Sequence, residues 1–172
     1  AKEFVKKKQQ DSENKEKEEK LREQEKEKRL EQRQIAKERI PVIAKSLLEC
    51  KQGATTIDEI TIEVAESGKA NFCYSDSNNY DDVFHIGLGE VLCKSDPKMV
   101  YCGLFEQGEK IRVIVYAGDE ISKEKSAGDI VKSISQILGG AGGGSPKFAQ
   151  GGGTDKSKKE DAIKNAKSMI IE

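Results

Sequence analysis

The sequence predicts an α/β (α+β) domain, with a small mixed sheet of about four strands and packed helices, preceded by a long charged helical arm. Charged residues make up 35% of the chain, against ~25% in an ordinary domain, so much of the charge must lie outside a core. Apolar residues are sparse near the start, whereas strand-like and helix-like patterns alternate from residue 53 onward. We therefore predict a helical arm over residues 1–52 and a globular domain over residues 53–172. Because the chain begins with Ala1 rather than Met, we expect it to be part of a longer protein.

The arm consists largely of Lys, Glu, Gln and Arg, which are good helix formers. Oppositely charged residues recur four apart, as in Glu13/Lys17 and Glu25/Arg29, and each pair adds about 0.2–0.5 kcal/mol to an exposed helix. No heptad repeat of apolar residues is sustained, so a coiled coil is not predicted. A disordered charged linker is the alternative to the helix.

Apolar residues become denser toward the end of the arm and follow a helical spacing. Pro41 is expected to kink or restart this helix, and Gly53 to end it. The apolar stripe packs either against its own domain or against a second subunit. As a dimerisation element, the stripe comprises Leu30, Ile35, Ile40, Ile43 and Leu47.

Four segments of the globular part have the composition of strands. Ile60, Ile62 and Val64 alternate with polar residues, as in a half-buried strand. Two later segments rich in β-branched and aromatic residues flank a turn that contains Gly108, which predicts a hairpin. The predicted strands cover residues 60–64, about 71–75, 99–105 and 111–117.

Three helices are predicted in the same part from apolar spacing and from signals at their ends. The first begins after Asp81, which can cap it, and the second ends at Gly139. The third runs from about residue 157 to 170, with Ser157 and Glu160 at the spacing of a capping box. The apolar faces consist of Phe84, Leu88, Val91 and Leu92 in the first helix and of Ile130, Ile134, Ile137 and Leu138 in the second.

The net charge of −1 hides an uneven distribution. Residues 1–52 hold 16 basic and 12 acidic residues, a net +4, whereas residues 53–120 hold 5 and 13, a net −8. Residues 121–172 hold 9 and 6, a net +3. A polyanion is therefore expected to contact the ends of the chain. Alternatively, the lysine-rich helices are simply well solvated.

Cysteine and histidine offer little chemistry. Cys50, Cys73, Cys93 and Cys102 show no CxxC spacing, so we expect four reduced cytosolic thiols, most of them in the core, and no metal site. His85 is the only histidine, and we interpret it as a packing or helix-surface residue rather than a catalyst. No apolar run approaches the ~20 residues that span a bilayer, so no membrane partner is expected.

Residues 139–153 contain eight of the sixteen glycines, around a central Ser-Pro-Lys-Phe-Ala-Gln. Such a run is either a flexible linker or an ordered loop whose backbone amides approach an anion or a ribose-phosphate closely. A Walker loop is excluded, because Gly144 precedes Ser145 where Gly-Lys-Ser/Thr is needed. The Rossmann spacing fails as well, because residue 145 is neither glycine nor alanine.

The run resembles the signature of the DHH-associated domain, in the form that closes alanyl-tRNA synthetases. That signature is Gly-Gly-x-Gly-Gly-Gly, a short spacer with proline, Ala-Gln and further glycine. Upstream, Ala127-Gly128-Asp129-Ile130 is similar to the Ala-Gly-containing helix start of the family. The resemblance covers about residues 55–172. The matching positions are Gly139, Gly140, Gly142, Gly143, Gly144, Pro146, Ala149, Gln150, Gly152 and Gly153.

The resemblance implies a non-catalytic module that binds the elbow of tRNA(Ala) and supports a homodimer, in a cytoplasmic enzyme that attaches alanine to tRNA. It implies no cofactor in this chain, with ATP and zinc expected only in other parts of that enzyme. The family often has a basic residue where Ser145 stands, so the tRNA contact there is open. The residues that we expect to bind tRNA combine this motif with Ser145 and with lysines beside it that could neutralise phosphates. They are Gly139, Gly140, Gly142, Gly143, Gly144, Ser145, Pro146, Lys147, Gln150, Lys156, Lys158 and Lys159.

Two other functions fit the residues. The chain is alternatively the nucleic-acid-binding half of a DHH-class phosphoesterase, or a purely structural oligomerisation domain. Phe148 either stacks on an unpaired base or packs under the glycine loop, and the lysines either neutralise phosphates or solvate a helix start.

Overall fold

The protein is described by a computed structural model that covers residues 2–50, 52–77 and 80–171. The chain divides into two compact units, one through Ile35 and one from Ala36 onward. The sequence analysis placed its division after residue 52. The second unit therefore begins inside the segment that the sequence assigned to the arm.

Helix α1 (Lys2–Glu49) accounts for most of the predicted arm, which was assigned to residues 1–52. From its start through Ile35, every side chain that is described is exposed, as expected for a helix supported by charge pairs rather than by a core. The predicted long helical arm is confirmed. Pro41 lies inside the helix, which ends eight residues later, before Gly53.

The second unit contains a seven-stranded sheet in the order β1-β2-β3-β4-β5-β7-β6. Only β3 and β4 of this sheet run parallel, because helix α2 (Asp82–Ser95) connects them as a crossover. All other neighbours are antiparallel. The strands are β1 (Gly53–Ile57), β2 (Ile60–Glu66), β3 (Asn71–Ser77), β4 (Met99–Gln107), β5 (Lys110–Ala117), β6 (Ala141–Gly144) and β7 (Phe148–Gly153).

The fold class is confirmed, whereas the expected number of strands is too small. The four predicted strands correspond to β2, β3, β4 and β5. The sequence analysis missed β1, whose residues are mostly exposed and show no alternation, and it interpreted the strands β6 and β7 as a loop. Glycine-rich strands carry too few side chains to show the two-residue period of a strand.

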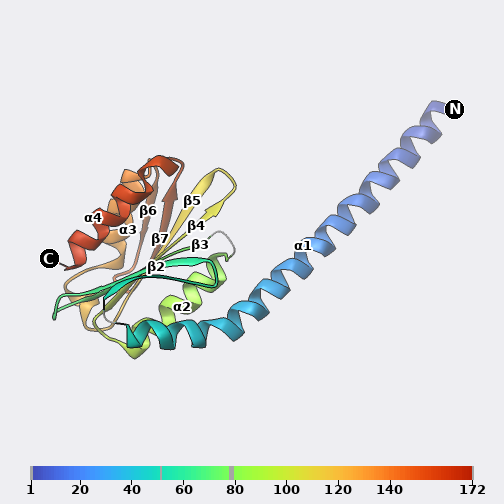
Figure 1. The fold of residues 1–172 in the computed structure, drawn as a ribbon. Helices are drawn as coiled ribbons and strands as arrows, with labels where there is room; N and C mark the ends of the chain where they lie inside the picture. The colour runs from blue at the N-terminus through green and yellow to red at the C-terminus, as the bar shows by residue number, and fades with distance from the viewer. Residues whose placement is uncertain (1, 51, 78–79, 172) are drawn as a thin grey trace. The chain divides into compact units, whose positions relative to one another are not determined.

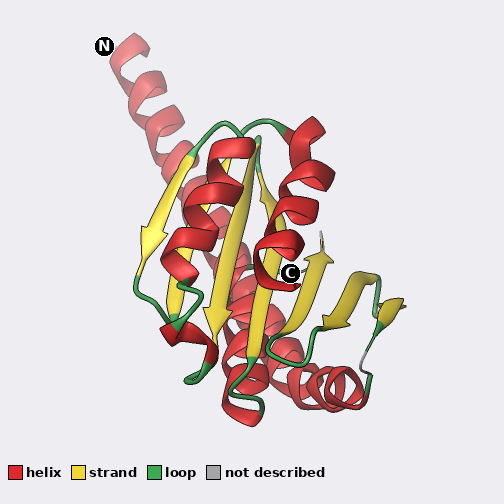
Figure 2. Cartoon of the chain, turned by 90° about the vertical axis from the view of Figure 1, so that its left-hand side faces the viewer, coloured by secondary structure: helices red, strands yellow, loops and turns green. Residues whose placement is uncertain are grey.

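Different helices cover the two faces of the sheet (Figures 1 and 2). Helices α3 (Ala127–Ile137) and α4 (Lys159–Ile171) pack on one face, over a core that includes Phe72, Leu104 and Val113. Helix α2 and residues 36–49 of α1 pack on the other face, over a second core that includes Ile62 and Tyr101. The unit is therefore a three-layer arrangement with a core on each side of the sheet.

Most predicted helix ends agree with the structure. The Asp81 side chain caps α2 by accepting a hydrogen bond from the Val83 N–H at 3.2 Å, and Gly139 follows α3 with a φ of +77°. The predicted capping box at Ser157 is wrong, because a short 3-10 turn (Lys156–Lys158) precedes α4 and the Asp155 side chain caps that turn. Val91, which was assigned to the apolar face of α2, is 37% exposed.

All four cysteines are free thiols, as expected, and three are buried in the cores. Burial raises the pKa of Cys93 to about 12, and burial also raises the pKa of Cys73 and Cys102, so these thiols stay protonated. Among the described residues, no helix is long and apolar enough to cross a membrane.

Candidate functional site

The glycine-rich run forms a β-hairpin at the edge of the sheet. β6 pairs with β7 in a register that places Ala141 opposite Gly152 and Gly144 opposite Ala149. The turn between the strands is closed by Ser145, whose hydroxyl donates to the Phe148 carbonyl and accepts from the Phe148 N–H, both at 3.1 Å. The run is therefore an ordered element, and the Ser145 hydroxyl already has partners within the turn.

Close packing explains why most of these positions are glycine. A Cβ atom at Gly142 would collide with Val131 of α3, and one at Gly151 would collide with Ser135 of the same helix. A Cβ at Gly144 would lie 2.6 Å from the Ala149 Cα, inside the hairpin itself. Gly143 differs, because its Cβ would meet only the end of the Lys132 side chain, at 3.8 Å.

The start of α3 is fixed by the same hairpin. The Ala127 N–H donates to the Pro146 carbonyl at 2.8 Å, and the Gly128 N–H donates to the Ser145 carbonyl at 3.2 Å. A Cβ at Gly128 would lie 2.9 Å from the Gly144 carbonyl oxygen, which explains the Ala-Gly pair at this helix start. The first amides of α3 are thus occupied by the turn and are not presented to a ligand.

Several amides that the sequence analysis assigned to a ligand cradle also bond inside the fold. The N–H groups of Gly139 and Gly140 donate to the carbonyls of Gln136 and Ser135, at 3.1 and 2.8 Å. The Gly152 N–H donates to the buried Ser135 hydroxyl at 3.1 Å. The hairpin therefore offers a ligand a surface without bulky side chains rather than a ring of free amides.

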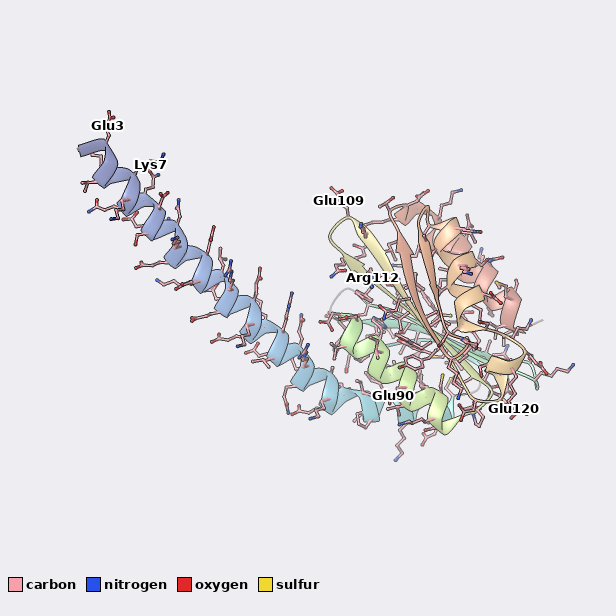
Figure 3. All side chains as sticks on the ribbon, turned by 180° about the vertical axis from the view of Figure 1, so that it is seen from behind. Glu3, Lys7, Glu90, Glu109, Arg112 and Glu120 are labelled. Atoms are coloured by element: carbon pink, nitrogen blue, oxygen red, sulfur yellow. The ribbon has the colours of Figure 1, made fainter. Side chains whose placement is uncertain are left out.

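That surface lies on the sheet face opposite α3, where β5, β7 and β6 form a groove of about 500 Å³. Arg112 of β5 lies opposite Gly152 of β7, and its Nη2 atom donates to the Gln150 Oε1 atom at 3.1 Å. Figure 3 shows Arg112 on the strand that leads away from the hairpin tip at Glu109. The groove is lined by Lys110, Ile111, Arg112, Gly139, Gly140, Ala141, Gln150, Gly151, Gly152, Gly153 and Thr154.

Of the groove residues, only Gly139, Gly140 and Gln150 were among the predicted tRNA-binding residues. The sequence analysis did not assign the other groove residues to tRNA binding, namely Lys110, Ile111, Arg112, Ala141, Gly151, Gly152, Gly153 and Thr154. One signal was available, because Arg112 is the only arginine after Arg39. It stands in a largely apolar strand, and its guanidinium group can bind a phosphate through two hydrogen bonds. Its position beside Gln150, however, depends on a strand register that joins residues 38 apart.

Of the four lysines assigned to tRNA, three form ion pairs within the protein. Lys147 lies 2.8 Å from Asp119 and lowers the pKa of that carboxyl group, chiefly through their hydrogen bond. Lys156 lies 3.2 Å from Glu106, and Lys159 pairs with Asp76, where both side chains are about one-fifth exposed. Lys158 is exposed. An incoming phosphate can compete with the exposed pairs, because solvent screens such pairs and they contribute little to stability.

Phe148 and Tyr116 form an aromatic pair beside the groove. They are cross-strand partners, and their ring centroids are 4.7 Å apart with a 44° tilt. Both are half-buried. Pro146 and Lys147, in the turn that precedes Phe148, are exposed.

The residues assigned to dimerisation separate into two groups. Ile43 and Leu47 are buried in the core beneath α1, and Ile40 packs against the edge of that core. Leu30 and Ile35 are 56% and 48% exposed. Ile43 and Leu47 thus pack within their own chain, and the other two remain accessible to a partner.

His85 lies in a buried polar cluster on the α2 side of the sheet. Its Nδ1 atom is 2.8 Å from the Tyr101 hydroxyl and 3.2 Å from the Ser75 hydroxyl, and those two hydroxyl groups are 2.5 Å apart. Burial lowers the pKa of His85 to about 3, so the ring is neutral. These side chains are fully buried, so a substrate cannot reach them.

Comparison with known proteins gives consistent matches. The family model of the DHHA1 domain matches residues 71–172, which begin with β3. An alanine–tRNA ligase from Nitrosopumilus maritimus is 40% identical over 169 residues, covering 98% of this chain and 18% of that protein. One from Cenarchaeum symbiosum is 33% identical over 141 residues, covering 82% of this chain and 15% of that protein. The chain thus spans less than a fifth of the length of these relatives.

A solved structure shares the fold. The C-Ala domain of alanyl-tRNA synthetase from Aquifex aeolicus superposes with a TM-score of 0.59 and 25% sequence identity. The superposition covers 63% of this chain and 98% of that domain. Nearly the whole of that domain therefore has a counterpart here.

Proposed function

The chain belongs to the DHHA1 domain family, and from this premise we propose that it is the non-catalytic C-terminal module of an alanine–tRNA ligase. In this proposal the module binds the elbow of tRNA(Ala) and supports dimerisation. The names of the relatives and of the C-Ala domain support the assignment to a ligase. The attachment of alanine to tRNA, with ATP, takes place in other parts of that enzyme.

The observation that carries the proposal is Arg112, held beside Gln150 over a floor of glycines in an open groove. A guanidinium group binds phosphate oxygens with two parallel hydrogen bonds. The glycine floor lets a ribose-phosphate backbone approach the sheet closely. Lys110, on the same face of β5, adds a second positive charge. The groove therefore suits a folded polyanion.

Titration of tRNA(Ala) against the protein at two salt concentrations tests the proposal. We expect the affinity to fall with salt, because binding neutralises phosphates. Arg112→Ala should weaken binding and reduce the slope of log affinity against log salt by about 1. Lys164→Ala is the matched control, because it removes one positive charge from an exposed position on α4, which packs on the other face.

Three results would contradict the proposal. The protein would fail to bind tRNA, its affinity would not change with salt, or it would bind an unstructured RNA of equal length as tightly. Self-association without any RNA binding would favour the purely structural oligomerisation domain instead.

Dimerisation is tested separately, at the exposed apolar residues of the arm. Because Ile43 and Leu47 are buried in their own unit, we assign the contact to Leu30 and Ile35. Sedimentation should show a dimer for the unaltered chain and a monomer for the double variant Leu30→Asp/Ile35→Asp. Leu21→Asp, also in the exposed part of α1, should leave the dimer intact.

A further inference from the structure

We propose that Phe148 is a stacking platform for a base at the exposed end of a stack in a folded RNA. The RNA would then be bound through a base as well as through its phosphates. This inference rests on the proposed function, because it specifies how the same sheet face meets its RNA.

Phe148 is held in place by a cross-strand neighbour that is itself fixed. Tyr116 packs against α2 at Gly89, where an added Cβ would lie 2.7 Å from the Tyr116 Cδ2 atom. The Phe148 ring rests against Tyr116 at 4.7 Å between centroids. The platform is therefore set before any ligand arrives, which lowers the entropy cost of stacking.

Packing in the two hydrophobic cores does not explain why residue 148 is aromatic. Tyr116 packs against the core on the α2 side, whereas Phe148 belongs to neither of the two core clusters. In the part of the chain that the structure describes, α2 packs mainly against β4 and β5 of this sheet face. Figure 3 shows this side of the unit, with Glu90 on α2 and Arg112 on β5. The Phe148 side chain is thus partly exposed at the surface of the sheet, beside the groove.

The charges around Phe148 match a base between two phosphates. Gln150 follows two residues later on the same face of β7 and holds Arg112 at 3.1 Å. Lys147 precedes Phe148 directly, and its pair with Asp119 is weak because the two side chains are 62% and 84% exposed. An aromatic ring with cations on both sides, on an open sheet, is a typical surface for stacking a base.

A single-tryptophan variant tests the stacking directly. The chain contains no tryptophan, so Phe148→Trp introduces a single tryptophan whose emission can be excited selectively over that of the four tyrosines. Titration with folded tRNA(Ala) should quench its emission, and the quenching should saturate at the concentration where binding saturates. Lys164→Trp is the matched control, because it places the reporter on α4 at the other face, and it should show no saturable quenching.

Affinity measurements provide a second readout. Phe148→Ala should weaken tRNA binding by about 5- to 100-fold, because stacking is lost, with the salt slope unchanged, because no phosphate contact is lost. Phe148→Tyr should bind within about twofold of the unaltered chain, because a tyrosine ring also stacks on bases. Arg112→Ala should show the opposite pattern, with a reduced slope.

The outcomes separate the two proposals. If the unaltered chain binds no RNA, the proposed function fails and the stacking fails with it. If it binds tRNA with salt dependence, but Phe148→Ala binds equally well and Phe148→Trp is not quenched, only the stacking is wrong. Equal quenching by an unstructured RNA at the same concentrations would overturn the assignment to a folded stack. If Phe148→Ala does not fold, the tryptophan and tyrosine variants still decide.

Discussion

At the scale of single residues, His85 is the most unusual side chain of the second unit. Its ring stacks on Phe105 at 5.3 Å between centroids, and its Nε2 atom is buried with no hydrogen-bond partner among the described residues. A Cβ at Gly103 would lie 2.9 Å from the His85 Cγ atom, so the sheet fits closely around the ring. A neutral ring fits this site, whereas a charged ring would be strongly destabilised by burial.

We therefore predict that stability falls as pH drops below 6.5. The pKa of His85 is about 3 in the folded protein and about 6.5 in the unfolded chain, so the unfolded chain binds the additional proton. The contribution of the neutral His85 ring to the free energy of unfolding is fully present above pH 6.5. As pH falls from 6.5 toward 3, this contribution decreases by up to about 1.4 kcal/mol per pH unit. Urea unfolding at pH 7, 6 and 5 would measure this, and His85→Gln should flatten the dependence between pH 6.5 and 5.

The NMR signal of the ring provides the check, because the chain has only one histidine. The signal should not titrate between pH 5 and 8 in the folded protein. An ordinary titration midpoint near 6.5 would contradict the prediction.

At the scale of elements, the glycine hairpin packs closely against α3. Gly142 and Gly151 are neighbours across β6 and β7, and both would collide with α3 if they carried a side chain. The function of these glycines is therefore to let the hairpin lie flat against a helix. The sheet face that points away from α3 then becomes the smooth floor of the groove.

Two alanine substitutions in β6 should separate packing from ligand contact. We predict that Gly142→Ala destabilises the protein by about 1–3 kcal/mol, because its Cβ would overlap Val131 and Gly151. Gly143→Ala is the matched control and should change stability by less than about 1 kcal/mol, because its Cβ has space. Urea unfolding measures both, and equal effects would contradict the packing explanation.

Helix α4 is held to the sheet by ion pairs to two strands. Lys159 pairs with Asp76 of β3, and Lys167 lies 2.5 Å from Glu63 of β2. Asp76 also accepts a hydrogen bond from the Tyr74 hydroxyl at 3.1 Å. Lys159 thus has a structural partner, although the sequence placed it among the tRNA-binding residues.

We predict that Lys159→Met reduces stability by about 1–2 kcal/mol and leaves tRNA affinity nearly unchanged, because Asp76 would lose its partner in a largely buried site. Lys158→Met, one position earlier and exposed, is the control and should change stability by less than about 0.5 kcal/mol. Thermal unfolding and tRNA titration check both variants. If Lys159→Met greatly lowered the affinity for tRNA without changing stability, Lys159 would instead be a tRNA-binding residue.

At the scale of the whole molecule, the second unit depends on the last turns of α1. Ile43 and Leu47 are fully buried against the sheet and α2. Burial of such side chains contributes about 1.5–3 kcal/mol each, which is a large share of the ~5–15 kcal/mol that stabilises a domain.

We therefore predict different behaviour for two truncations. Residues 36–172 should fold with a melting temperature within about 3 °C of the whole chain, because the core is complete. Residues 53–172 lack Ile43 and Leu47 and should not fold stably. Circular dichroism melts of the two fragments test this, and equal stability of both would show that the end of α1 is dispensable.

The sequence predicted the parts of the fold that have strong periodicity or clear caps. Asp81 and Gly139 marked helix ends correctly, and the alternation of Ile60, Ile62 and Val64 marked a strand. The glycine run could not be predicted as strands, because a residue without a side chain shows no inside or outside. The groove could not be predicted either, because the contact between Arg112 and Gln150 exists only in one register of β5 and β7.

The order of strands in the sheet has a consequence for synthesis on the ribosome. β7 lies between β5 and β6, although it is the last strand to be made. Until β7 emerges, β5 is an unpaired edge strand that carries Ile111, Val113 and Val115 on one face. The inner face of α3 then packs against β5 and lacks the two glycine-rich strands that it also contacts. A nascent chain that pauses before the hairpin thus exposes an aggregation-prone edge, so completion of the glycine strands protects the newly made protein as well as shaping its groove.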